Sequence, residues 1–467
     1  MENILSRYLR FSLMRGMTVV AGFKLGLGRQ SFRAIHICKF HRRLKDKSIF
    51  AREFSSSEAK DIINDESVIT SKDMRKILKA YVGTGDFFKD NSRNSSASTL
   101  SQDDLETRTV NDSVKRAVIP LGEDPLRRDK YLTFYKTVRI GMLLEDMDTL
   151  AGLVGYKYYK GPSTERTAPF ALVTASVDKF DIRESYIRSD RNIWMTGFVS
   201  YAGKTSLEIT IHLDQENGES RKRVADATFV MVARDPVEQQ GVFVNRLVPQ
   251  TPEEQEIYNK SAKSRKEMKL SKQQSLFKAA PTAEERNIIH DLFLTTLDRT
   301  KSTFHNRVKP PNTVWMEQTR LKNLIICHPQ SRNVYNKIFG GFLMREAFEL
   351  GWATTCVHIK SRPSIISMDD INFRKPVEVG SLLYLSSQIV FTDGNYLQTR
   401  VHAEVLDPKT GHIDTTNVFH YHFTSKQEFP RVIPMSYGEY MLYLEGRRHA
   451  ENYTRKQQSS DESVGSL

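Results

Sequence analysis

Two long stretches of the chain carry apolar residues with the period of a helix. The first covers 139–156 and the second 341–358. In the first stretch the apolar positions recur at steps of three and four residues, which predicts a buried helix. They are Ile140, Leu143, Leu144, Met147, Leu150, Ala151 and Val154. Because apolar residues cover most of the surface of such a helix, other structure must wrap around it.

Four runs rich in Val, Ile, Thr and Phe follow each predicted helix, and their composition predicts strands. The runs after the first helix are 171–180, 193–201, 206–213 and 224–233, and those after the second are 364–373, 382–391, 396–406 and 416–424. A curved antiparallel sheet around one central helix would provide the required enclosure. The fold class predicted from this order is α+β.

The second set of elements repeats the first. The segment VDKFDI (177–182) resembles MDDINF (368–373), which lies 191 residues later, and the helix starts Gly141 and Gly341 lie 200 residues apart. Nearly constant spacing in helix and strands indicates duplication of a whole domain, with a longer loop after the first helix. Chance similarity among strand-forming segments is the alternative.

Composition divides the rest of the chain into an N-terminal region, a linker and a tail. Residues 55–126 are mixed and include a Ser- and Asn-rich stretch at 91–104, which predicts a partly disordered extension. Residues 236–312 are charged and predict a linker with two or three helices. We therefore expect domains at 127–235 and 313–425, and a C-terminal extension at 426–467.

Residues 1–54 have the composition of an organelle transit peptide. Positions 1–45 hold ten Lys or Arg and one acid, so they supply +9 of the formal charge of +13. This asymmetry indicates mitochondrial targeting, and a basic tail without a targeting role is the alternative. The remaining chain is nearly neutral for its size, which argues against a nucleic-acid partner. No run of about 20 apolar residues is present, so we expect no membrane span.

The sequence disfavours several kinds of site. The three cysteines form no CxxC pair, which argues against a disulfide scaffold and a structural zinc site. No GxSxG segment is present, which excludes a serine α/β-hydrolase. His420 and His422 share a strand face, but no third ligand lies near them in the sequence. We therefore expect no metal and no redox cofactor.

Three segments resemble a known family. HPQSRNVYNKIFGGFLM (328–344), DDINFRKPVEVG (369–380) and TFVMVARD (228–235) are similar to motifs of the mitochondrial double-hotdog acyl-CoA thioesterases. The resemblance covers residues 127–235 and 313–445. It implies two tandem hotdog domains, hydrolysis of acyl-CoA to a fatty acid and coenzyme A, and a homo-oligomer. It also implies a place in lipid metabolism in the mitochondrial matrix, with or without association with the inner membrane.

In similar thioesterases one copy supplies an Asn before a Gly-Gly pair, and the other supplies an Asp within its helix. The Asn matches Asn333, and segment 132–138 of the first copy holds no Asn. The Asp matches Asp148, whose counterpart 200 residues later is Phe348. The first copy keeps the Asp but lacks the Asn, and the second copy keeps the Asn but lacks the Asp. This predicts one complete composite site and one inactive pseudo-site. Asp146 is the alternative acid if the alignment shifts. The plainer alternatives are a turn residue for Asn333 and an ion-pair partner for Asp148.

These residues have the chemistry that thioester hydrolysis requires. A carboxylate beside an apolar tunnel can deprotonate water, so Asp148 is the expected general base, and direct attack by Asp148 through an anhydride stays open. The Asn333 side chain and the Gly341 N–H can bind the carbonyl oxygen at a helix start. Coenzyme A carries phosphates, so Arg374 and Lys375 are expected to bind the substrate at the entrance. Gly340 is also an expected substrate-binding residue, because glycine allows a close approach at the helix start. Solvated surface charge is the alternative for the two cations.

Two other functions stay open at this point. A non-catalytic acyl-CoA sensor would bind its ligand without turnover. A hotdog hydratase or dehydratase would need a His at the start of a central helix, where this chain has Arg139 and Phe339.

Overall fold

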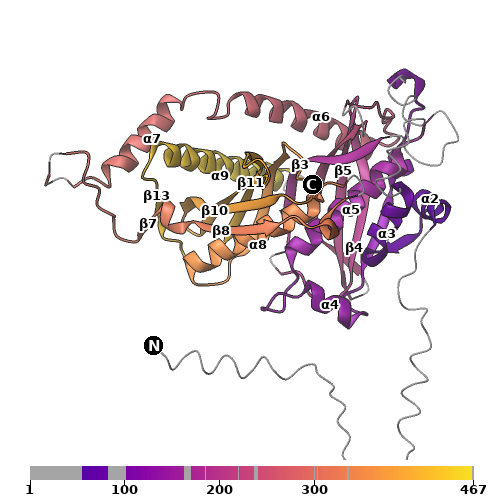
Figure 1. Ribbon diagram of the computed structural model, residues 1–467, viewed down its shortest axis with the longest axis horizontal. Helices are drawn as coiled ribbons and strands as arrows, with labels where there is room; N and C mark the ends of the chain where they lie inside the picture. The colour runs from indigo at the N-terminus through magenta and orange to yellow at the C-terminus, as the bar shows by residue number, and fades with distance from the viewer. Residues whose placement is uncertain are drawn as a thin grey trace, which may run out of the picture. The chain divides into compact units, whose positions relative to one another are not determined.

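Two long helices, α5 (Ile140–Tyr158) and α8 (Gly340–Ile359), organise the fold (Figure 1). They confirm the two helices predicted from the apolar period. The computed structural model describes residues 55–82, 101–161, 170–184, 186–218, 220–235, 240–298, 300–301, 303–333 and 336–464. The predicted transit peptide at 1–54 lies outside these residues.

The first half of the chain wraps five strands around α5. The strands follow the order β2, β4, β5, β6 and β3, antiparallel at every step, and α5 contacts each of them. Glycine brings the sheet close to the helix, since a Cβ at Gly197 would lie 2.9 Å from a methyl group of Val154. The bounds are β2 Lys115–Ile119, β3 Ala171–Ile182, β4 Ile193–Ala202, β5 Ser206–Asn217 and β6 Ser220–Arg234.

The second half repeats this arrangement around α8. Its strands follow the order β8, β10, β11, β12 and β9, again antiparallel at every step. The bounds are β8 Leu321–Ile326, β9 Ser364–Phe373, β10 Leu382–Asp393, β11 Tyr396–Leu406 and β12 Ile413–Thr424. Each half is therefore an antiparallel sheet around one long helix, which confirms the α+β fold with two tandem hotdog units.

The two sheets join through β3 and β9, so the described residues contain one 11-stranded sheet. Val177 pairs with Ile371, and Phe180 pairs with Met368. The repeat spacing of 191 residues relates Val177 to Met368 and Phe180 to Ile371, so each pair contains the counterparts of the other pair. The junction therefore lies on a local twofold axis that relates the two copies.

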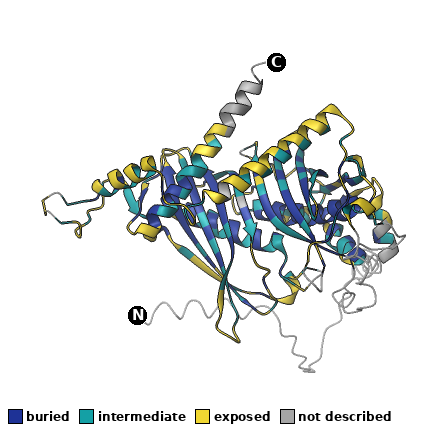
Figure 2. Ribbon diagram, turned by 90° about the horizontal axis from the view of Figure 1, so that it is seen from above, coloured by how far each residue is buried: buried dark blue, intermediate teal, exposed yellow. Residues whose placement is uncertain are grey.

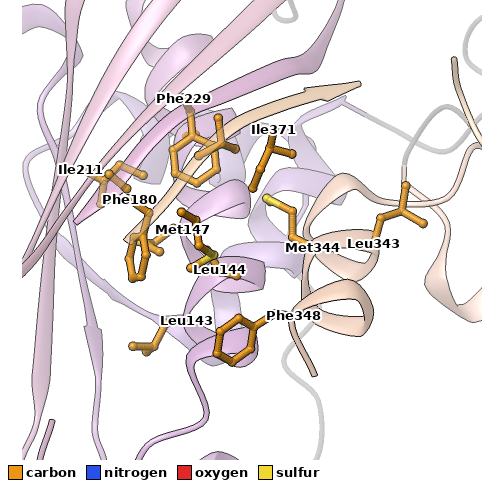
Figure 3. Close-up of a cluster of buried hydrophobic side chains, with 14 of the residues drawn as sticks. Leu143, Leu144, Met147, Phe180, Ile211, Phe229, Leu343, Met344, Phe348 and Ile371 are labelled. Atoms are coloured by element: carbon orange, nitrogen blue, oxygen red, sulfur yellow. The ribbon is translucent and has the colours of Figure 1, made fainter. Parts of the chain in front are cut away.

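The core lies between the central helices and the inner faces of the strands (Figure 3). Leu144 and Met147 of α5 approach Met344 of α8, and Phe180 and Phe229 cover them from the sheet. All five side chains are fully buried. Burying a side chain of this kind contributes about 1.5–3 kcal/mol, so this layer holds the two halves together as well as filling each one.

The segment 55–126 contributes ordered elements to the first half. Helices α2 (Ser56–Asn64) and α3 (Ser71–Val82) contact α5, and β1 (Val68–Thr70) pairs in parallel with β2. Strand β2 also comes from this segment, and the sequence analysis predicted no strand before the first helix. The part of the Ser- and Asn-rich stretch at 91–100 lies outside the described residues.

Helices from the linker and the tail cover the outer faces of the sheet (Figure 2). Linker helix α6 (Pro252–Gln273) packs on β4, with the Tyr258 and Tyr201 rings 5.0 Å apart. The tail helix α9 (Tyr437–Val464) packs on β10. The remaining α-helices and strands of the described residues are α4 Pro125–Tyr131, α7 Ala283–Leu294, β7 Thr313–Trp315 and β13 Arg431–Ile433. Within the described ranges, none of the helices combines the length and the apolar character that crossing a bilayer requires.

Candidate active site

A cavity of about 470 Å³ lies between the two halves and brings the predicted site residues together. Its volume is in the usual range for a small-molecule site. The lining includes five of the six predicted residues, namely Asp148, Asn333, Gly340, Arg374 and Lys375. The sixth, Gly341, is buried next to Asp148 and touches it through its backbone.

The carboxylate of Asp148 is held by both copies of the repeat. The hydroxyl of Thr174 on β3 donates to Oδ1 at 2.6 Å, and the N–H of Gly341 donates to Oδ2 at 2.7 Å. Gly341 lies in the first turn of α8, where the helix dipole adds partial positive charge. The acid from the first copy is thus fixed by the backbone of the second. This Gly341 N–H bonds to the carboxylate, whereas the sequence analysis expected it to bind the substrate carbonyl.

Burial sets the acidity of this group, because Asp148 is only 2% exposed. Burial raises the pKa of Asp148 to about 6, although the hydrogen bonds from Thr174 and Gly341 and the charge of Arg75 act in the opposite direction. The carboxylate form therefore predominates above about pH 6. A base whose pKa lies this close to neutral suits proton abstraction from water.

Asn333 lies shortly before α8 and is joined to Lys337 by two hydrogen bonds, which close a tight loop. Its Oδ1 accepts the Lys337 N–H at 3.1 Å, and its own N–H donates to the Lys337 carbonyl at 2.6 Å. The first copy has the same loop, in which Thr133 N–H donates to the Thr137 carbonyl at 2.8 Å and Thr133 Oγ1 accepts the Thr137 N–H at 3.2 Å. Thr133 is therefore the structural counterpart of Asn333, at the predicted spacing of 200 residues.

Paired glycines let the two central helices cross closely. A Cβ at Gly341 would lie 2.8 Å from the Glu145 Cα, and a Cβ at Gly141 would lie 2.8 Å from Arg345 Cγ. The two crossings are related by the spacing of the repeat. Gly340 has a different role, because it lines the cavity together with Asp148, and a Cβ there would lie 3.2 Å from Asp148 Oδ2.

Asp146, the alternative acid, faces away from the site. Its carboxylate accepts the Tyr131 hydroxyl, and Asp146 is absent from the cavity lining. Burial raises the pKa of Asp146 to about 7, but its carboxylate is turned toward Tyr131 and not toward the cavity. The geometry therefore favours Asp148.

Comparison with known proteins decides the family. The chain is 47% identical to bovine mitochondrial acyl-coenzyme A thioesterase 9 over 393 residues, which cover 83% of this chain and 90% of the relative. It is 49% identical to the human protein of the same name, over 75% of this chain and 79% of the relative. The chain belongs to the acyl-coenzyme A thioesterase family. Its class is therefore that of the thioester hydrolases.

Other comparisons add less to this family assignment. A search against protein-family models finds none that matches the chain. Among solved structures, an acyl-CoA hydrolase from Staphylococcus aureus, in complex with butyryl coenzyme A, coenzyme A and coenzyme A disulfide, is similar at 19% identity with a TM-score of 0.31. That similarity covers 33% of this chain and 98% of the bacterial one.

Cations dominate the charged lining of the cavity in this thioesterase. Lys375 forms an ion pair with Asp414 at 2.6 Å, and Lys337 pairs with Glu378. These surface pairs are weak and can exchange for a stronger anion. The cationic lining residues are Arg75, Lys79, Arg234, Arg332, Lys337, Arg374 and Lys375.

Two residues of the candidate site were not predicted from the sequence. Arg75 reaches the cavity from α3, where it pairs with Glu145 and lies 4.7 Å above the Phe339 ring. No sequence signal marks it, because its neighbours are set by tertiary packing. Thr174 could have been found from the repeat, since its counterpart 191 residues later is Ile365. That polar-to-apolar exchange parallels the one between Asp148 and Phe348.

Proposed function

We propose that this chain hydrolyses acyl-CoA thioesters at one composite site, with Asp148 from the first copy and Asn333 from the second. The observation that carries the proposal is the buried Asp148 carboxylate, which faces the shared cavity and is held by Thr174 and Gly341. A carboxylate has about four lone-pair positions, so two such bonds leave capacity for a water molecule. Asp148 then acts as the general base that takes a proton from that water.

The negative charge that forms on the thioester oxygen needs donors in a dry site. We assign this role to the Asn333 side-chain amide, aided by the N-terminal end of α8. The Lys337 N–H fixes the Asn333 oxygen, which orients the amide plane beforehand. Gly340 lets the thioester approach, because it leaves the space in front of Asp148 unfilled.

The charged coenzyme A end and the apolar acyl end of the substrate require different parts of the cavity lining. The phosphates of coenzyme A fit the cationic lining, with Arg374 and Lys375 on the turn after β9. The acyl chain fits the apolar wall that includes Leu78, Tyr156 and Leu172. Leu78 belongs to α3, so the N-terminal segment takes part in forming the acyl pocket.

The cellular location follows from two observations. The relatives that are 47–50% identical to this chain are named mitochondrial, and residues 1–45 carry a net charge of +9. We therefore propose mitochondrial import, with the matrix as the compartment. Microscopy of a fluorescent fusion with and without residues 1–54 tests this, and a fusion that stays outside mitochondria would refute it.

We also propose that the chain forms a homo-oligomer. Strand β8 ends the sheet, and its Leu324 and Ile326 are 49% and 54% exposed. An open apolar edge favours pairing with another chain. Light scattering on the purified protein measures the mass, and a monomer at micromolar concentration would refute the proposal.

The direct test of the activity is release of free thiol from a panel of short to long acyl-CoAs by residues 55–467. We expect turnover by the wild type, together with a loss of two or more orders of magnitude in Asp148→Ala and Asn333→Ala. Binding without thiol release would instead indicate the acyl-CoA sensor. Turnover that both variants retain would refute the composite site and leave the family assignment intact.

A further inference from the structure

Three side chains from distant parts of the chain meet on the outer face of the second sheet. They are Asp369 of β9, His422 of β12 and His449 of α9. Side chains alternate along a strand. Tyr421, the neighbour of His422, faces inward and packs its ring 5.5 Å from Phe348 of α8. His422 therefore faces outward, beneath α9.

The spacing of these groups matches a metal site. His422 Nε2 lies 3.0 Å from Asp369 Oδ1, and His449 Nδ1 lies 3.3 Å from Asp369 Oδ2. The three ligand atoms all lie within 4.8 Å of one another. Zinc bonds of 2.0–2.1 Å in a tetrahedron separate neighbouring ligand atoms by roughly 3.4 Å. Small side-chain shifts would therefore let one ion bind all three groups.

The surroundings hold both imidazoles in place. The Tyr396 hydroxyl contacts His422 Nδ1, which leaves Nε2 directed at Asp369. Metal-binding histidines usually carry a hydrogen-bond partner of this kind on the other ring nitrogen. The His420 ring stacks 4.5 Å from the His449 ring and positions it from the other side.

The site is enclosed on one side and open on the other. The His422 side chain is fully buried, whereas that of Asp369 is 21% exposed, so an ion can enter from solvent. Oδ1 of Asp369 faces His422 and Oδ2 faces His449, so the carboxylate lies between the two imidazoles, where it can act as a ligand.

We propose that Asp369, His422 and His449 bind one divalent transition-metal ion of the zinc class, with a fourth position open to water. The ion would fix α9 to the sheet next to the β3–β9 junction. The sequence predicted no metal, because no third ligand lies near His420 and His422 along the chain. The fold brings Asp369 of β9 and His449 of the tail helix to His422, and His420 is not one of the three ligands. This site is separate from the Asp148 cavity, whose lining includes none of the three ligands.

The test is a Zn²⁺ titration of the full chain after chelator treatment, with metal content measured by mass spectrometry. We expect about one equivalent of bound zinc and a Tm that rises when Zn²⁺ is added. His449→Ala removes a ligand from a partly exposed helix face, so it should fold and bind more than about 100-fold more weakly. Tyr396→Phe removes only the supporting hydroxyl and should weaken binding about 10–100-fold.

The matched control is His412→Ala, which removes a histidine that is 70% exposed and pairs with Asp414 outside the cluster. This variant should bind zinc like the wild type. Co²⁺ provides a second readout, because a tetrahedral His and Asp site gives visible absorption that His449→Ala should abolish. If the wild type retains no zinc, or if His449→Ala binds as tightly as His412→Ala, the proposal is wrong. A Tm that depends on His449 but not on Zn²⁺ would also refute it and assign the cluster to a proton-linked ion pair.

Discussion

The proposed composite site and the proposed pseudo-site occupy related backbone positions in the two copies but hold different side chains. At four related positions the composite site has a polar group or a glycine, and the pseudo-site has a bulkier or less polar replacement. The pairs are Asp148 with Phe348, Thr174 with Ile365, Asn333 with Thr133, and Gly340 with Ile140. The pseudo-site is also filled, because the Phe348 ring packs 5.5 Å from Tyr421 and 6.4 Å from Phe423.

The exchanges are divided between the two copies. The first copy keeps Asp148 and Thr174 but has Ile140 and Thr133, and the second copy has the reverse. Neither copy is therefore intact or degenerate as a whole. The polar residues are grouped by the cavity that they face, which is the pattern expected if one cavity of the pair kept its chemistry and the other became core.

The strongest test of this comparison is Asp148→Asn. We expect kcat to fall about 10²–10⁴-fold, because a general base is removed. We also expect a gain in stability. The folded state raises the pKa of Asp148 from 3.8 to about 6, so the free energy of unfolding falls as the pH rises through that window. At neutral pH the ionised group costs about 3 kcal/mol, and the amide avoids most of that cost.

Thiol release and urea unfolding at pH 7 measure the two effects of Asp148→Asn. A variant that loses both activity and stability would mean that Asp148 holds the structure together, and the assignment as base would fail. Unfolding at pH 4, where the wild-type carboxyl is protonated, is the internal control, because the stability difference should shrink there.

The matching change in the pseudo-site is Phe348→Ala. We expect a loss of about 3–5 kcal/mol in the free energy of unfolding, because the ring is a buried part of the core. In the fraction that stays folded, kcat should remain within about threefold of the wild type, since the ring is absent from the Asp148 cavity. Phe348→Leu is the milder form for the kinetic measurement. A kcat that falls with Phe348→Leu as far as with Asp148→Asn would mean that both cavities are catalytic.

The loops give a second matched pair, Asn333→Ala and Thr133→Ala. Loss of one oxyanion donor costs about 10²–10³-fold in kcat, so we expect that effect from Asn333→Ala. Thr133→Ala removes a hydrogen bond in the same loop geometry without facing the composite cavity. It should lower stability by about 1 kcal/mol and leave kcat unchanged. If both variants lowered kcat equally, the assignment of Asn333, but not Thr133, as the oxyanion donor would be wrong.

The smallest effect is expected from Thr174→Val. Its hydroxyl stabilises the ionised form of Asp148, so its loss should raise the pKa of Asp148 further. The acid limb of the kcat profile should then move up by about one pH unit, because a hydrogen bond to a charged group contributes about 1.5 kcal/mol or more. Above pH 8 the variant should approach the wild-type rate. An unshifted acid limb would mean that another group controls the pH dependence.

The sequence predicted much of this architecture because the repeat supplied an internal comparison. The spacing of 200 residues led from Asp148 to Phe348, and the strand bounds of β9 and β11 agree with the predicted runs. Strand β2 was not found, because it lies before the helix in a segment whose low-complexity stretch dominated its interpretation. Its short run Lys115–Ile119 becomes a strand through pairing with β4.

Residues brought together only by tertiary packing could not be predicted. Arg75 reaches the cavity because α3 packs on α5, and His449 reaches Asp369 because α9 lies over the second sheet. Neither helix belongs to the repeat, so no internal copy marked these positions. The position of Gly341 was predicted, but its N–H bonds to Asp148, since only the crossing of the helices determines which group that amide meets.

The pairing of β3 with β9 also has a consequence for how the chain folds. The partners Val177 and Ile371 are roughly 190 residues apart, so a chain that arrives N-terminus first, from a ribosome or a translocation pore, presents β3 long before β9. At synthesis rates of about 5–20 residues per second the delay is about 10–40 s. During that time β3 is an unpaired strand edge, which is the kind of surface that misassembles or recruits a chaperone. The first half therefore presents one open sheet edge until β9 arrives, because β1 extends only the opposite edge, beside β2.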